Sequence, residues 1–159
     1  MIERYSRKEL KDIWSEENKY KIWLEVEIAA AEAMEKFKII PKGVSSIVKK
    51  KGKIKVKRIH DIEAKVKHDV IAFLTSITEQ AGIKARYLHQ GMTSSDVLDT
   101  SFNIQLMQSG KIILKDIDKI LIVLKRQAKK YKMTPCIGRS HGIHAEPITF
   151  GLKLASFYE

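Results

Sequence analysis

Two histidines stand three residues apart near the end of the chain, His141 and His144, in the glycine-flanked segment 138–147. Imidazole gains or loses a proton near neutral pH, so a histidine here suits general acid–base catalysis. The glycines predict a loop that holds an imidazole against a small ligand, and an apolar helix is expected from about Pro147. The segment therefore predicts a proton-transfer site just before a helix.

Metal binding is a weaker interpretation of the same segment. His141, His144 and Glu146 are possible ligands, but they lie in a glycine- and proline-containing loop. No further Cys or His cluster completes a tetrahedral set around them. We therefore expect no metal site, and we favour acid–base chemistry.

A second candidate site is the polar segment 93–96, Thr-Ser-Ser-Asp, which precedes a long apolar pattern. Thr93 suits a helix N-cap, with Asp96 in the capping-box position three residues later. Free backbone N–H groups at a helix start, together with the hydroxyls of Thr93 and Ser94, suit an anion such as a carboxylate. The same residues also fit a helix cap alone, and the two roles are compatible.

Two shorter motifs carry weaker signals. Lys67-His68-Asp69 is predicted to lie inside a helix, where His68 is best interpreted, from spacing alone, as a partly buried histidine with a satisfied hydrogen bond. Arg4 and Tyr5 combine a guanidinium with a phenol, which suits phosphate recognition. A surface arginine beside a packed tyrosine is the commoner explanation of that pair.

The elements that position these residues are predicted to be helices, because apolar residues recur at helical spacing and proline and glycine are sparse. We expect one or two helices over residues 8–38, and further helices over 44–49, 58–80, 96–131 and from about 147. The only strand candidate is a short extended piece at residues 136–140. The fold class predicted from this pattern is all-α.

Composition narrows the function class. The chain has 159 residues, 44% of them hydrophobic, and a formal net charge of +11. Seven of the ten residues from Lys49 to Arg58 are basic, but that segment has no aromatic residue for stacking on nucleic-acid bases. No apolar run is long enough to cross a membrane. The lone Cys136 suits a reducing compartment, so we expect a cytoplasmic protein.

The segments 92–100 and 139–151, taken together, resemble adenylosuccinate lyases, a family of the aspartase/fumarase superfamily. Arg4-Tyr5 and Lys67-His68-Asp69 fall where that family has substrate-contacting residues, so four places match in order. The resemblance implies a lyase of purine nucleotide biosynthesis. It would release fumarate from adenylosuccinate, giving AMP, and from the succinylaminoimidazole carboxamide ribotide. It also implies that no metal or organic cofactor is needed.

The resemblance assigns roles residue by residue. It makes His141 the general acid that protonates the leaving nitrogen, and His68 a supporting catalytic residue that orients or pairs with substrate. Thr93 and Ser94 correspond to contacts with the succinyl carboxylate. The remaining substrate-binding residues implied by the family pattern are Arg4, Tyr5, Lys67, Asp69 and His89, the last as a further phosphate contact.

The same resemblance implies an organisation. Residues 1–93 would form the N-terminal helical domain, and residues 94–159 the beginning of the central helical bundle of a homotetramer. The helix expected from Pro147 has no C-terminal stop signal, so we expect the chain to be the N-terminal part of a longer protein. The family's general-base serine lies in a downstream loop that this sequence does not contain. We therefore expect these 159 residues to be inactive alone.

Two alternatives remain open from the sequence. One is another fumarate-releasing lyase of the superfamily, such as an argininosuccinate or carboxymuconate enzyme, although segments 93–96 and 140–144 argue against it. The other is a basic helical module that binds nucleic acid through residues 49–58. The second leaves both histidine segments unexplained, so a small-molecule substrate is the expected partner, with neither nucleic acid nor membrane.

Overall fold

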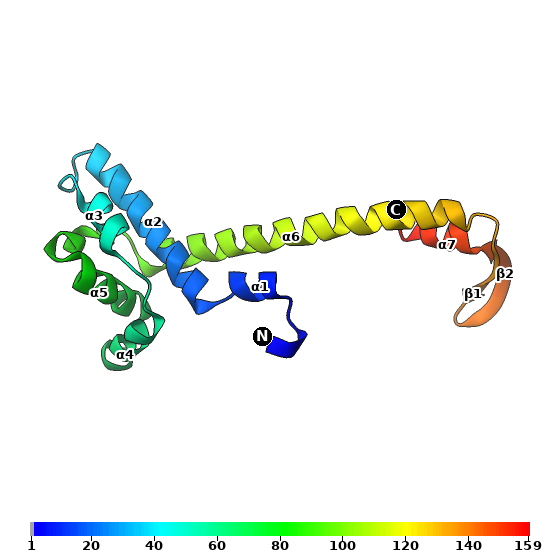
Figure 1. Ribbon diagram of the computed structural model, residues 1–159, viewed down its shortest axis with the longest axis horizontal. Coiled ribbons are helices and arrows are strands. Elements are labelled where there is room, and N and C mark those ends of the chain that lie inside the picture. The colour runs from blue at the N-terminus through cyan, green and yellow to red at the C-terminus, as the bar shows by residue number, and fades with distance from the viewer. Residues whose placement is uncertain (1) are drawn as a thin grey trace. The chain divides into compact units, whose positions relative to one another are not determined.

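The computed structural model describes residues 2–159, apart from the side chain of Glu3, as a succession of helices with one two-stranded sheet in that range (Figure 1). The predicted all-α class is confirmed. The chain forms two compact units, Met1–Ser109 and Gly110–Glu159. The division falls within α6 (Ser94–Lys130). The domain boundary predicted at residue 93 coincides with the start of α6 and stays a prediction.

The first unit packs several helices, together with the start of α6, around one apolar core (Figure 1). A 3-10 turn, η1 (Glu3–Tyr5), precedes α1 (Lys8–Ile13), and Ser15 then caps α2 by accepting from the N–H of Asn18. The sequence predicted one or two helices over residues 8–38, and this cap divides that segment into two. The remaining elements are α2 (Glu16–Lys36), α3 (Val44–Lys51), α4 (Val56–Val66), α5 (Asp69–Ala81) and the 3-10 helix η2 (Ile83–Tyr87).

Three aromatic rings join α2 to α5 at the centre of this unit. Tyr20 stacks on Phe73 with ring centroids 6.0 Å apart, and Trp23 meets Phe73 edge-on at 5.5 Å. All three side chains are buried. Offset-stacked and edge-to-face pairs are favourable beyond the area that they bury, so this cluster fixes how the two helices pack.

Burial of Tyr20 predicts a loss of stability in alkali. Its burial, and after that the nearby Glu16 carboxylate, raises the pKa of Tyr20 from 10.0 to about 12. Above pH 10 the unfolded chain therefore releases the tyrosine proton before the folded chain does, and folding stability falls as the pH rises toward 12. The expected loss is about 2 kcal/mol. Denaturant unfolding at a series of pH values measures it. The free energy of unfolding of Tyr20→Phe should fall less steeply with pH over this range. An equal slope in the variant and the wild type would contradict the assignment of the loss to Tyr20.

The helix predicted over residues 58–80 is wrong as a single element. It is broken between α4 and α5 at Lys67, whose φ is +56°, and at His68, whose backbone is extended. A left-handed residue at a helix C-cap, followed by an extended one, reverses the chain direction. His68 therefore lies outside a helix interior, and it caps α5 at its N-terminus.

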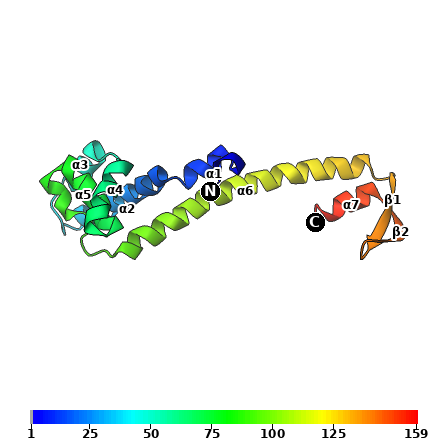
Figure 2. The same cartoon turned by 90° about the horizontal axis from the view of Figure 1, so that it is seen from below.

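The second unit contains the end of α6, a β-hairpin and a short helix. Strand β1 (Pro135–Ser140) pairs antiparallel with β2 (Ile143–Thr149), and α7 (Phe150–Ser156) follows. In Figures 1 and 2, α7 lies beside the C-terminal end of α6. A Cβ on Gly151 would come within 2.5 Å of the Ala128 carbonyl oxygen, so the close approach of the two helices requires glycine there.

The hairpin corrects two predictions. The loop expected over residues 138–147 is strand on both sides of a two-residue turn, and the final helix begins at Phe150 instead of about residue 147. The strand candidate at 136–140 is confirmed as part of β1. A register shift occurs between Ile137 and Arg139, where a Cβ on Gly138 would come within 2.7 Å of the Glu146 carbonyl oxygen. Glycine therefore permits this bulge.

Candidate active site

His141 occupies the tip of the β1–β2 hairpin. Ser140 pairs with Ile143, which leaves His141 and Gly142 as the turn, with φ values of +52° and +78°. Positive φ at both central residues is the pattern of a type I′ turn, which favours Asn, Asp and Gly. A histidine in this left-handed conformation is costly by roughly 1 kcal/mol. Such a residue at an exposed tip supports a chemical role over a structural one.

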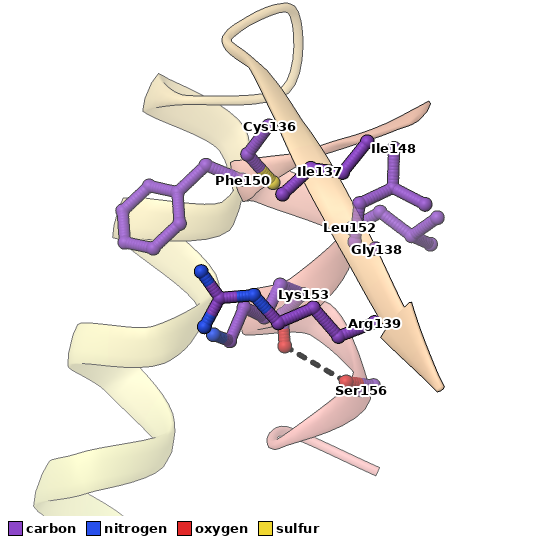
Figure 3. Close-up of a pocket in the computed structure, with 9 residues that line it drawn as sticks. All are labelled: Cys136, Ile137, Gly138, Arg139, Ile148, Phe150, Leu152, Lys153 and Ser156. Atoms are coloured by element: carbon purple, nitrogen blue, oxygen red, sulfur yellow. Dashed lines mark hydrogen bonds between the residues drawn. The ribbon is translucent and has the colours of Figure 1, made fainter. Parts of the chain in front are cut away.

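A hollow of about 520 Å³ lies beside the hairpin, within the second unit (Figure 3). Strand β1 and α7 supply its walls, and Arg139 and Lys153 bring two cationic side chains to it. His141 is not among the residues that line this hollow. The imidazole predicted to move a proton is exposed at the turn instead.

His68 is held at the N-terminus of α5. Its Nδ1 accepts a long hydrogen bond of 3.4 Å from the N–H of Ile71 and lies 3.5 Å from Oδ1 of Asp69. The carboxylate of Asp69 is turned to the N–H of Val70, at 2.7 Å. The side chain of His68 is 43% exposed, so its ring edge is open to a ligand. The interpretation of His68 as a partly buried helix histidine is wrong.

Lys67 makes no ion pair with the described residues, and its backbone forms the left-handed C-cap of α4. Lys67, His68 and Asp69 therefore form a short polar corner between two helices. This corner places a cation, an imidazole and a carboxylate on consecutive residues at the surface of the first unit.

His89 lies in the turn that follows η2, and its partner is a buried carboxylate. Its Nδ1 is 2.6 Å from Oε1 of Glu27, and its backbone N–H donates to Oε2 of the same residue at 2.8 Å. The side chain of Glu27 is fully buried, whereas that of His89 is 19% exposed. The pair joins α2 to the turn before α6 across 62 residues of sequence.

Glu27 was not anticipated from the sequence. The available signal was a carboxylate on the apolar face of α2, one turn after Trp23 and one turn before Ala31, both of which are buried. A buried acid requires hydrogen-bonding partners, so its position alone indicated a polar contact inside the fold. The partner, however, comes from a distant turn that no spacing rule identifies.

Thr93 and Ser94 lie at the start of α6, as the sequence predicted. The capping relation with Asp96 is confirmed in one direction: the Thr93 N–H donates to Oδ2 of Asp96 at 2.8 Å. Among the described contacts, no hydrogen bond engages the hydroxyl of Thr93 or that of Ser94. Both hydroxyls at this helix start therefore lack a hydrogen-bond partner among the described residues.

Arg4 and Tyr5 are exposed in η1, and the guanidinium carbon of Arg4 lies 4.7 Å from the centroid of the Tyr5 ring. The two side chains form a cation–π pair, which leaves the guanidinium N–H groups available to an anion. The alternative of a packed tyrosine is wrong, because Tyr5 is 74% exposed.

A groove of about 390 Å³ lies between α5 and the η2 turn within the first unit, and neither His68 nor His89 is among the residues that line it. Ile71, whose N–H bonds to His68, and Leu88, which precedes His89, both line it. Residues next to each histidine therefore reach this groove, but the two imidazoles do not line it. His141 belongs to the second unit.

No helix within residues 2–159 is long and apolar enough to cross a membrane. In the same range, no group of three or more His, Cys, Asp or Glu side chains is placed to hold a metal ion.

A family model described as lyase matches residues 3–159. The chain belongs to this lyase family. The adenylosuccinate lyase of Thermotoga maritima is 48% identical over 158 residues, which cover 99% of this chain and 37% of the relative. The adenylosuccinate lyase of Bacillus subtilis is 44% identical over 100% of this chain and 37% of its own length. The chain therefore spans about 37% of the length of these lyases.

The fold is also similar to that of other lyase-family structures. A crystal structure of fumarate lyase from Mesorhizobium sp. matches with a TM-score of 0.87 and 26% identity, covering 94% of this chain and 36% of that chain. The resemblance found in the sequence is confirmed at the level of the lyase family. The hairpin, the helix corner at His68 and the start of α6 belong to a segment that the family model matches throughout.

Proposed function

We propose that this chain is the N-terminal part of an adenylosuccinate lyase of purine nucleotide biosynthesis. The observation that carries the proposal is the 44–48% identity to two adenylosuccinate lyases along nearly the whole chain. The placement of Thr93 and Ser94 at a helix start with unengaged hydroxyls supports it, because the substrate presents carboxylates and a phosphate. Identity to the fumarate lyase structure is only 26%, which favours adenylosuccinate lyase over another member of the superfamily.

In the proposed reaction, a base removes a proton from the carbon next to a succinyl carboxylate and leaves an aci-carboxylate. The electron pair left by the C–H bond then forms the double bond of fumarate as the C–N bond breaks. The C–N electron pair leaves with the nitrogen, to which His141 gives a proton. The base is supplied by residues outside this chain. Metal and organic cofactors are not needed for any of these proton transfers.

The proposed substrate-binding roles belong to polar residues of the first unit. Thr93 and Ser94 bind the succinyl carboxylate at the start of α6. Arg4 and Tyr5 bind the phosphate through the open guanidinium and the phenol. Lys67, His68, Asp69 and His89 complete the substrate site, with His68 orienting the substrate.

We also propose a homotetramer and a cytoplasmic location for the complete protein. Large apolar side chains stay exposed along α6, as expected for a helix that packs into a bundle. They are Phe102, Leu106, Met107, Ile113, Leu114, Ile117, Ile120, Ile122 and Val123. The unpaired Cys136 fits a reducing compartment.

The test is turnover of adenylosuccinate by the complete protein, followed by the absorbance change as AMP forms and by a separate assay of fumarate. We expect stoichiometric AMP and fumarate, and the same chemistry on the succinylaminoimidazole carboxamide ribotide. The 159-residue chain alone is expected to give no turnover above background. Turnover of argininosuccinate or of a carboxymuconate in place of adenylosuccinate would overturn the proposal.

A further inference from the structure

Glu27 is the one acidic residue among the fully buried side chains of the described chain. It lies on α2 within the same apolar face as Trp23 and Ala31. Removing a carboxylate from water is costly unless hydrogen bonds replace the lost hydration. The residue that donates those hydrogen bonds therefore indicates what the buried carboxylate does in the fold.

Both carboxylate oxygens of Glu27 are used by a single residue, His89. One oxygen accepts from the backbone N–H at 2.8 Å, and the other lies 2.6 Å from Nδ1 of the ring. The two contacts hold the backbone and the side chain of His89 at once. They also support its left-handed backbone, with φ of +62°, which is unfavourable for a residue other than glycine.

This arrangement decides which nitrogen of His89 is available. Nδ1 faces the buried carboxylate at 2.6 Å, a contact that favours the tautomer with its proton on Nδ1. Nε2 has no hydrogen bond among the described residues and is absent from the buried polar atoms that lack a partner, so it reaches solvent. The ring is therefore fixed with Nε2 outward. The preceding residue, Leu88, lines the groove between α5 and η2, whereas His89 itself does not.

We propose that Glu27 is a positioning residue: it holds the imidazole of His89 through Nδ1, so that Nε2 meets a phosphate or carboxylate oxygen of the substrate. The proposal rests on the proposed function, in which His89 contacts substrate. Glu27 itself touches no substrate, because its side chain is fully buried. Histidines in metal sites are oriented by carboxylates in the same way, and loss of such a partner typically lowers affinity or activity by about 10- to 100-fold.

Glu27→Gln tests the proposal with little change of shape. The amide oxygen can keep the bond from the His89 backbone N–H, but the amide N–H₂ then faces Nδ1, which must accept instead of donating. A charge-assisted hydrogen bond is replaced by a weaker neutral one. We expect kcat/KM for adenylosuccinate in the complete protein to fall by about 10- to 100-fold, mainly through KM. The matched control is Glu16→Gln, since Glu16 also pairs with a histidine, His60, but on the surface at 3.0 Å. It should leave kcat/KM unchanged.

A double-mutant cycle separates positioning from a general loss of structure. His89→Asn tolerates the left-handed backbone and removes the ring. If Glu27 acts through His89, Glu27→Gln adds no further loss of kcat/KM in the His89→Asn background. Losses that multiply in the double variant, or a Glu27→Gln protein within twofold of the wild type, would overturn the proposal.

Nitrogen NMR of the labelled histidine ring gives a second readout that does not depend on turnover. We expect Nδ1 of His89 to carry a proton in the wild type and in Glu27→Asp, and to lose it in Glu27→Gln. An unchanged Nδ1 signal in Glu27→Gln would show that Glu27 does not set the ring. Absence of wild-type turnover would instead refute the proposed function, and the NMR result would still decide whether Glu27 holds His89.

Discussion

His141→Asn is expected to abolish most of the turnover of the complete protein while leaving its fold intact. Loss of a general acid lowers the rate of a proton-transfer step by about 10²- to 10⁴-fold, and we expect this loss in kcat with little change in KM. Stability should stay the same or rise slightly, because Asn adopts the left-handed conformation of residue 141, at φ +52°, more readily than His.

Steady-state kinetics on adenylosuccinate and thermal unfolding of the same preparation measure both effects. The control is His60→Asn, which removes a surface histidine that pairs with Glu16 and is expected to keep wild-type kinetics. If His141→Asn kept a kcat within tenfold of the wild type, the general acid would have to be another group. A fall in Tm of several degrees would instead indicate that His141 stabilises the hairpin.

Phe73→Ala is expected to destabilise the first unit by about 3–5 kcal/mol. Phe73 is fully buried and contacts both Tyr20 and Trp23, so truncation leaves a cavity where α2 meets α5. A loss of this size is a large share of the 5–15 kcal/mol that stabilises a typical domain. It would also loosen α2, the helix that carries Glu27.

Urea unfolding of the 159-residue chain, followed by circular dichroism, measures the free energy of unfolding. The matched control is Phe37→Ala, because Phe37 follows the end of α2 and is 72% exposed. Its substitution should change stability by less than about 0.5 kcal/mol. If Phe73→Ala cost less than about 1 kcal/mol, the aromatic cluster would not be what holds the two helices together.

Helical periodicity was sufficient for most of the fold. The apolar positions of α2 and α6 recur over many turns, and both helices form close to the predicted residues. The division of residues 58–80 into α4 and α5 was not predictable in this way. The apolar pattern continues across Lys67 and His68. The break depends on the left-handed backbone of Lys67, and a lysine at that position gives no indication of such a conformation.

The hairpin shows a different limit. Strand β1 shows no alternation of apolar and polar residues, and the alternation in β2, over residues 143–147, is short and falls on residues that are all exposed. The turn dipeptide His141-Gly142 was the other local signal, since glycine favours positive φ. The pairing itself comes from backbone hydrogen bonds between the two strands. These bonds do not depend on side-chain type, so they leave no periodic pattern in the sequence.

The sequence by itself determined the helical class, the resemblance to the lyase family and the identity of the proposed acid, His141. Motif residues carry that information because their chemistry depends on residue type and on short spacing. Only the tertiary structure decided that His141 lies at the tip of a hairpin, that His68 caps α5, and that Glu27 holds His89. These three depend on contacts or backbone conformations that folding creates, and the last joins residues 62 positions apart.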